Sequence, residues 1–89
     1  MKNVQVAETR KSRKARTTPY QGTYDRFLER LIEAREATGM TQRDVSAQMG
    51  MSHSFLSKCE TGERRIDVIE FLQLAKLYAK PLDYFLAEP

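Results

Sequence analysis

Apolar residues recur along the chain with the spacing of amphipathic helices. From Thr23 onward they stand at positions i, i+3, i+4, i+7 and i+8 with charged residues between them: Tyr24, Phe27, Leu28, Leu31 and Ile32. This spacing predicts a helix of about 14 residues, and Gly39 is suited to the left-handed turn that ends it. No segment alternates apolar and polar residues with a period of two, so the pattern predicts an all-α fold.

Two short helices are predicted after Gly39. Thr41 is predicted to cap the first, with Asp44 three residues later as a variant of the capping box and Gly50 at its end. Ser52 is predicted to cap the next helix, at about 52–60. The link between them is so short that the chain must change direction sharply there.

The fourth predicted helix has the clearest beginning. Asp67 and Glu70 fit a capping box, and the apolar residues that follow have helical spacing. Lys80 and Pro81 are expected to stop this helix, and Pro81 suits the first position of a final short helix that carries Leu82, Phe85 and Leu86. The sequence therefore predicts five helices with tight connections.

Basic residues are concentrated at the N-terminus. Residues 1–18 contain six Lys and Arg against one Glu, a balance of +5, whereas residues 19–89 contain nine against eleven acidic residues, a balance of −2. Because the first segment has few apolar residues and many like charges, we expect residues 1–20 to be a disordered arm and residues 21–89 a single domain. The arm is interpreted either as a segment that contacts phosphates or as a solubilising extension, in part a remnant of cloning. Its candidate phosphate contacts are Arg10, Lys11, Arg13, Lys14 and Arg16.

The predicted helix at 52–60 has unusually few apolar residues. On a helical wheel of about 100° per residue, Leu56 and Cys59 face inward, and Phe55 lies beside Cys59, which favours a place at the core over contact with a thymine methyl group. The outward residues are Ser54, Ser57 and Lys58, with His53 at the edge. Short polar side chains and a cation on a narrow helix suit the base edges in the major groove of DNA.

At these positions the chain resembles the Xre and lambda-repressor family of helix-turn-helix regulators. The resemblance is carried by "TQRDVSAQMGMSHSFLSKCETG" and "ERRIDVIEFLQLAKLYAKPLDYFL", and with "LIEAREATGM" it spans roughly residues 24 to 87. It implies a five-helix, lambda-repressor-like fold in which five residues of the two-helix unit point inward: Val45, Met49, Met51, Leu56 and Cys59. Ser46 is a small departure, because alanine is common there.

The resemblance also implies roles for individual residues. Base-reading positions fall on His53, Ser54, Ser57 and Lys58, with the helix at 52–60 in the major groove. Gln42 matches a position that contacts phosphate and often supports base recognition, and Ser52 matches one that also meets the DNA backbone. Arg43 is a further candidate DNA-binding residue. Arg64 and Arg65 follow the recognition helix and are expected to contact phosphates, with solvent exposure or pairing to Glu63 or Asp67 as the alternative. Arg35 and Glu60 match a structural ion pair.

The hypothesis that follows is a sequence-specific, double-stranded DNA-binding transcriptional regulator, a homodimeric repressor that reads a palindromic operator. The alternatives are an antitoxin and a coactivator-like adaptor, which bind a protein partner through a similar domain. An enzyme is disfavoured, because His53 is the only histidine, without a metal-ligand partner at suitable spacing, and no catalytic motif is present. We expect no cofactor, no small-molecule effector and no membrane segment, and a location in a bacterial or phage-type cytoplasm.

Overall fold

The computed structural model describes residues 18–86. Five helices occupy this range: α1 (Gln21–Thr38), α2 (Gln42–Gln48), α3 (Phe55–Glu60), α4 (Val68–Tyr78) and α5 (Leu82–Leu86). The described part is all-helical, so the predicted fold class is confirmed. The five predicted arm cations lie outside the described residues: Arg10, Lys11, Arg13, Lys14 and Arg16.

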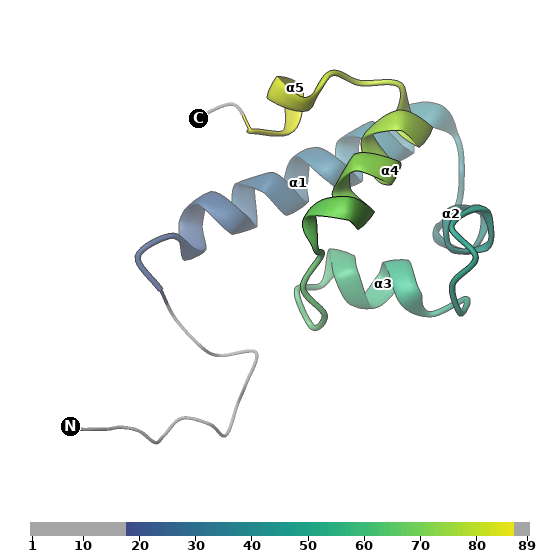
Figure 1. Ribbon diagram of the computed structural model, residues 1–89, viewed down its shortest axis with the longest axis horizontal. Helices are drawn as coiled ribbons and strands as arrows, with labels where there is room; N and C mark the ends of the chain where they lie inside the picture. Colours follow the sequence, from purple (N-terminus) through teal and green to yellow (C-terminus); the bar gives the residue numbers. More distant parts are fainter. Residues whose placement is uncertain (1–17, 87–89) are drawn as a thin grey trace.

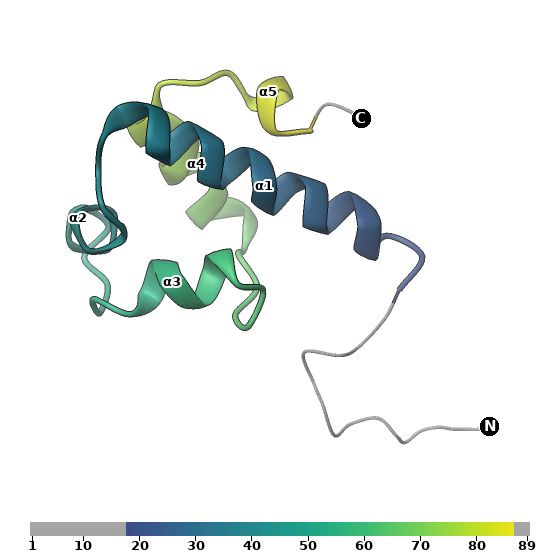
Figure 2. The ribbon, with the colours of Figure 1, turned by 180° about the vertical axis from the view of Figure 1, so that it is seen from behind.

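The longest helix, α1, runs through the molecule and contacts α3, α4 and α5 (Figure 1). Both views place α3 on one side of α1 and α4, and α5 on the other side (Figures 1 and 2). Helix α2 lies at one end, where it packs against α3. The two-helix unit formed by α2 and α3 is therefore turned away from α5.

The boundaries of α1 are explained by its two ends. At the C-terminus, Gly39 has a left-handed φ of 83°, and its N–H donates to Glu36 O, as the sequence predicts. At the N-terminus the helix begins at Gln21 and has 18 residues, so the predicted length was too short. The added first turn is polar, and the Gln21 side chain donates to Asp25 Oδ1 at 2.9 Å, which apolar spacing could not reveal.

Two helices begin with the predicted capping boxes. In α2 the Thr41 hydroxyl accepts the N–H of Asp44, and in α4 the Asp67 carboxylate accepts the N–H of Glu70, with the reciprocal bonds also present. Lys80 and Pro81 were predicted to stop α4, but the helix already ends at Tyr78, because Ala79 has a left-handed φ of 58°. The final helix accordingly begins at Leu82 rather than Pro81.

Every helix contributes to one hydrophobic core. Aromatic rings join three of the helices, since Phe71 of α4 makes edge-to-face contacts with Phe27 of α1 and Phe85 of α5 at centroid distances of 5.1 and 5.5 Å. The buried apolar residues within the described range are Leu28, Leu31, Ala34, Val45, Phe55, Leu56, Cys59, Phe71, Leu74, Ala75, Tyr78 and Phe85. This core fixes the position of α3, which supplies three of its members.

Candidate nucleic-acid interface

The connection from α2 to α3 differs from the prediction. Helix α3 begins at Phe55, three residues later than expected, and residues 52–54 form the turn that precedes it. Ser52 therefore does not cap the helix. Met51, predicted to point inward, is 37% exposed. The turn is stabilised by the Met51 N–H, which donates to Ser46 O at 2.9 Å, and by a left-handed φ of 71° at Gly50.

Ser46 holds the beginning of α3 from the neighbouring helix. Its side chain is fully buried, and its Oγ accepts the N–H of Leu56 at 3.1 Å. The first N–H groups of a helix have no partner within the helix, and Ser54 at the N-cap makes no side-chain capping bond. The hydroxyl of α2 thus replaces a local cap. From the sequence this serine is only a departure from alanine, and the signal for its role is a hydroxyl beside Val45 on the buried face of α2.

One side of α3 and its preceding turn is buried and the other faces solvent. Phe55, Leu56 and Cys59 are at most 3% exposed, so the interpretation of Phe55 as a core residue is confirmed. Burial also raises the pKa of the Cys59 thiol, which fits a small buried apolar residue. The solvent-facing side carries Ser52, His53, Ser54 and Lys58, with Ser57 half-buried. The Ser57 hydroxyl donates to Ser54 O at 3.1 Å, which leaves its oxygen as an acceptor.

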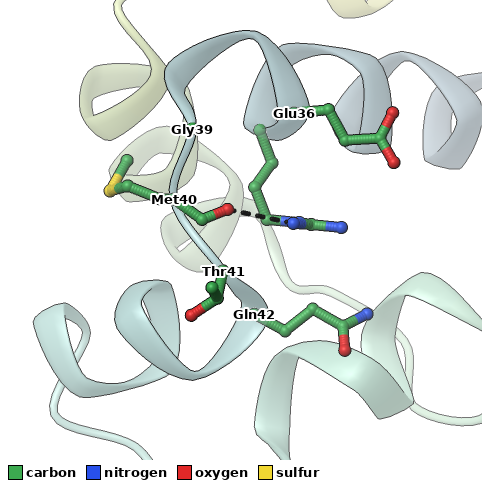
Figure 3. A pocket seen from close by; sticks show the side chains of 6 residues that line it. Glu36, Gly39, Met40, Thr41 and Gln42 are labelled. Atoms are coloured by element: carbon green, nitrogen blue, oxygen red, sulfur yellow. Dashed lines mark hydrogen bonds between the residues drawn. The ribbon is translucent and has the colours of Figure 1, made fainter.

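The C-terminal end of α3 is fixed by an ion pair with α1. Arg35 Nε and Nη2 donate to the two carboxylate oxygens of Glu60 at 2.8 and 3.2 Å, and the two side chains are only 13% and 6% exposed. Hydrogen bonding to Glu60 raises the pKa of Arg35. Arg35 Nη1 also donates to Met40 O at 3.0 Å, the hydrogen bond drawn as a dashed line at Met40 in Figure 3. One guanidinium therefore connects α1, the link to α2, and α3.

Gln42 joins the same network. Its Nε2 donates to Glu60 Oε1 at 2.7 Å, a bond that ties the first turn of α2 to the last turn of α3. Gln42 and Thr41 also line an open hollow of about 510 Å³ at the junction of α1 and α2 (Figure 3). Of the predicted backbone contacts on α2, Gln42 is therefore partly buried and held by Glu60, whereas Arg43 is exposed.

The two arginines after α3 have different surroundings. Arg64 binds both carboxylate oxygens of Glu70 at 2.8 and 3.0 Å and lies 4.9 Å from the centre of the Phe55 ring, so the predicted alternative of pairing with Glu63 or Asp67 was wrong. Hydrogen bonds from Arg64 lower the pKa of Glu70. Arg65 is exposed and stacks on Tyr24 at 4.0 Å from the ring centre.

Metal-binding clusters and membrane-spanning helices were sought among residues 18–86. Within residues 18–86, no group of three or more His, Cys, Asp or Glu side chains could hold a metal ion. None of the described helices has the length and apolar character needed to cross a membrane. The candidate interface is the solvent-facing side of α3 and its preceding turn, with exposed hydroxyls, an imidazole and cations. The core and two arginine–glutamate pairs hold the opposite side of α3 and the loop that follows it.

Comparison with known proteins identifies the family of this two-helix unit. A search of curated proteins and a search of solved structures gave no match. The family described as "Helix-turn-helix" matches residues 31–85, more than half of the chain, and the match includes α2, α3 and α4 in full. Domains of this family are DNA-binding regulatory domains and are not typically enzymatic. The chain belongs to the Xre and lambda-repressor type of the helix-turn-helix family.

Proposed function

We propose that this protein is a sequence-specific, double-stranded DNA-binding transcription regulator. In this proposal a homodimer occupies a palindromic operator and represses by occlusion. The observation that carries the proposal is the exposed polar side of α3 and its preceding turn, opposite three fully packed residues. Only three residues of this helix pack in the core, and the exposed hydroxyl, imidazole and ammonium groups can contact base edges in the major groove of DNA.

The side chains divide by the chemistry they can offer. His53, Ser54 and Ser57 are short enough to meet base edges, and the Ser57 oxygen acts as an acceptor because its hydrogen is already donated to Ser54 O. Lys58 supplies a flexible cation that binds either a guanine edge or a phosphate. The turn before α3 allows Ser52 and His53 to reach beyond the helix itself.

Backbone contacts are assigned to the residues around α3. Arg43 on α2 and Arg65 after α3 are exposed cations and suit phosphates. Gln42 retains its Oε1 and one Nε2 hydrogen after bonding to Glu60, so it offers a fixed amide to the backbone. Arg64 is held by Glu70 and Phe55, which favours a role in positioning the loop over direct phosphate contact.

A role as an adaptor or antitoxin is supported by a different observation. Val68 and Ile69, in the first turn of α4, are 66% and 61% exposed. Adjacent large apolar side chains at such exposure are typical of a surface that contacts another protein. A partner chain that remains bound through purification would favour this second function.

The deciding experiment is selection from a random pool of duplex DNA with the full-length protein at near-physiological salt, followed by sequencing. We expect a two-fold symmetric motif with half-sites about 10 base pairs apart. Enrichment of no motif, with only salt-sensitive retention, would contradict a sequence-specific regulator and favour the adaptor.

Variants then connect the motif to α3. Replacing His53, Ser54 or Ser57 with alanine should change the preferred base at one position and cost about 1–3 kcal/mol against the original site. Lys58→Ala and Arg65→Ala should instead weaken binding to all sequences alike if they contact phosphates. Competition binding with the original duplex and with duplexes changed at one base pair measures both effects. If the alanine variants of His53, Ser54 and Ser57 all keep the original base preference, these residues do not read bases.

A further inference from the structure

The loop between α3 and α4 holds two consecutive arginines against two different aromatic rings. Arg64 lies 4.9 Å from the centre of the Phe55 ring of α3, and Arg65 lies 4.0 Å from the centre of the Tyr24 ring of α1. The guanidinium of Arg64 is also bound to both carboxylate oxygens of Glu70. The guanidinium of Arg65 has a ring against it but forms no ion pair within residues 18–86.

Tyr24 also fixes the backbone beside Arg65. The Tyr24 hydroxyl accepts the N–H of Ile66 at 3.2 Å, and Arg64 Nη1 donates to the carbonyl oxygen of Arg65 at 3.0 Å. Both polar groups of the peptide between Arg65 and Ile66 therefore have partners. Because one tyrosine both holds this peptide and stacks on the guanidinium, it restrains the backbone and the side chain of Arg65 together.

The guanidinium of Arg65 is suited to binding a phosphate. Arginine presents five N–H donors in a planar fork, and two of them can bind two oxygens of one phosphate. A ring stacked on the flat face of the guanidinium leaves the edge with these donors open, and Arg65 is exposed. A long side chain loses conformational freedom on binding, so a side chain that is already restrained binds its ligand more tightly.

The loop that carries Arg65 lies close to the candidate nucleic-acid interface. It continues directly from the C-terminal end of α3, and both views place it on the side of α1 that α3 occupies (Figures 1 and 2). An arginine in this loop can reach the DNA backbone while α3 lies in the major groove. Tyr24 stands on α1, the helix behind this loop.

We infer that Tyr24 is a positioning residue for DNA binding, whose ring holds Arg65 so that the guanidinium donates two hydrogen bonds to one backbone phosphate. This inference rests on the proposed function, because the phosphate belongs to the duplex that α3 contacts. Since phosphates carry no sequence information, Tyr24 contributes to affinity and not to base preference. The competing explanation is that the Tyr24 ring only packs in the fold, where it lies 5.5 Å from the ring of Phe27.

The test is a double-mutant cycle on DNA affinity, measured by fluorescence anisotropy with the full-length protein and a duplex that it binds. Arg65→Ala should lower the affinity about tenfold and reduce the slope of its logarithm against the logarithm of salt concentration by about 1. Tyr24→Leu should lower the affinity about two- to fivefold, the range expected for an exposed cation–π pair. The double variant should bind as tightly as Arg65→Ala alone, because Tyr24 acts through Arg65.

Two control variants separate positioning from packing. Tyr24→Phe keeps the ring and removes only the acceptor of the Ile66 N–H, so it should restore most of the affinity that Tyr24→Leu loses, although it lowers stability. Arg43→Ala removes an exposed cation of α2 that stacks on no ring within residues 18–86, so its effect should add to that of Tyr24→Leu. Urea unfolding followed by circular dichroism shows that each variant is folded under the titration conditions.

The outcomes distinguish this inference from the proposed function. If the losses in Tyr24→Leu and Arg65→Ala add, or if Tyr24→Phe loses as much affinity as Tyr24→Leu, the ring only packs and the inference is overturned, while a selected motif still supports the regulator. If selection yields no motif, the proposed function fails, but the cycle can still be measured on an unrelated duplex because a phosphate contact is independent of sequence. Failure to bind any duplex overturns both.

Discussion

At the scale of single residues, Ser46 is the side chain on which the geometry of α3 depends most directly. A buried N–H without a partner costs about 1–3 kcal/mol, more than the net gain from an average hydrogen bond. Leu56 N–H avoids this cost through Ser46 Oγ, and the N-cap residue Ser54 contributes no side-chain bond. The hydroxyl on α2 thus fixes the first turn of the helix proposed to read DNA.

Ser46→Ala should therefore destabilise the protein by about 1–2 kcal/mol, because the Leu56 N–H remains buried without an acceptor. Urea unfolding followed by circular dichroism measures the loss. Ser54→Ala is the matched control, since its exposed hydroxyl makes no capping bond and its removal should change stability by less than about 0.5 kcal/mol. Equal losses in the two variants would show that the interhelical bond has no special role.

At the scale of elements, Glu70 connects the loop after α3 to the beginning of α4. It accepts two hydrogen bonds from Arg64 and one from the N–H of Asp67. These bonds favour the charged form, so the folded-state pKa of Glu70 lies below its usual value of 4.5. Its contribution to stability is complete above the unfolded-state pKa and is lost as the pH falls through the folded-state pKa.

We therefore expect the free energy of unfolding to begin to fall below about pH 5, in the window that the unfolded and folded pKa values of Glu70 define. Glu70→Gln should reduce this acid dependence and lower stability at pH 7 by about 0.5–1 kcal/mol, as the ion pair is partly exposed. Thermal unfolding between pH 3 and 7 measures both. Glu63→Gln, at an exposed position outside the ion pairs of the described residues, should leave the profile unchanged, and an equal change there would contradict the role of Glu70.

The elements themselves were largely predictable from the sequence, because capping boxes and apolar spacing act within a few residues. The beginning of α3 was not, since local reasoning placed the cap at Ser52 whereas the bond comes from Ser46 in another helix. The same limit applies to Arg64, whose partner Glu70 also belongs to the α4 capping box. At the candidate site, the outward residues of α3 could be named from the helical wheel, but the bond between Gln42 and Glu60 depends on tertiary contact.

At the scale of the whole molecule, the positive charge and the exposed polar face of α3 belong to different parts of the chain. Residues 1–18 have a balance of +5, and residues 19–89 a balance of −2. Because residues 19–89 carry a net negative charge, the phosphates of DNA repel this part of the chain weakly. Few exposed cations lie near α3, among them Arg43, Lys58 and Arg65. In the proposed complex with DNA, the N-terminal cations are the main source of attraction to phosphates that the sequence provides.

Deletion of residues 1–18 should therefore weaken DNA binding and flatten its dependence on salt. Each phosphate contact contributes about 0.9 to the slope of the logarithm of affinity against the logarithm of salt concentration, so loss of up to five contacts removes as much as about 4.5 from that slope. Fluorescence anisotropy titrations from 50 to about 300 mM salt measure it. A full-length variant with glutamine at all five candidate arm positions keeps the chain length and should behave like the deletion. If both variants keep the original slope, the phosphate contacts lie on the folded domain, and the N-terminal charge serves solubility instead.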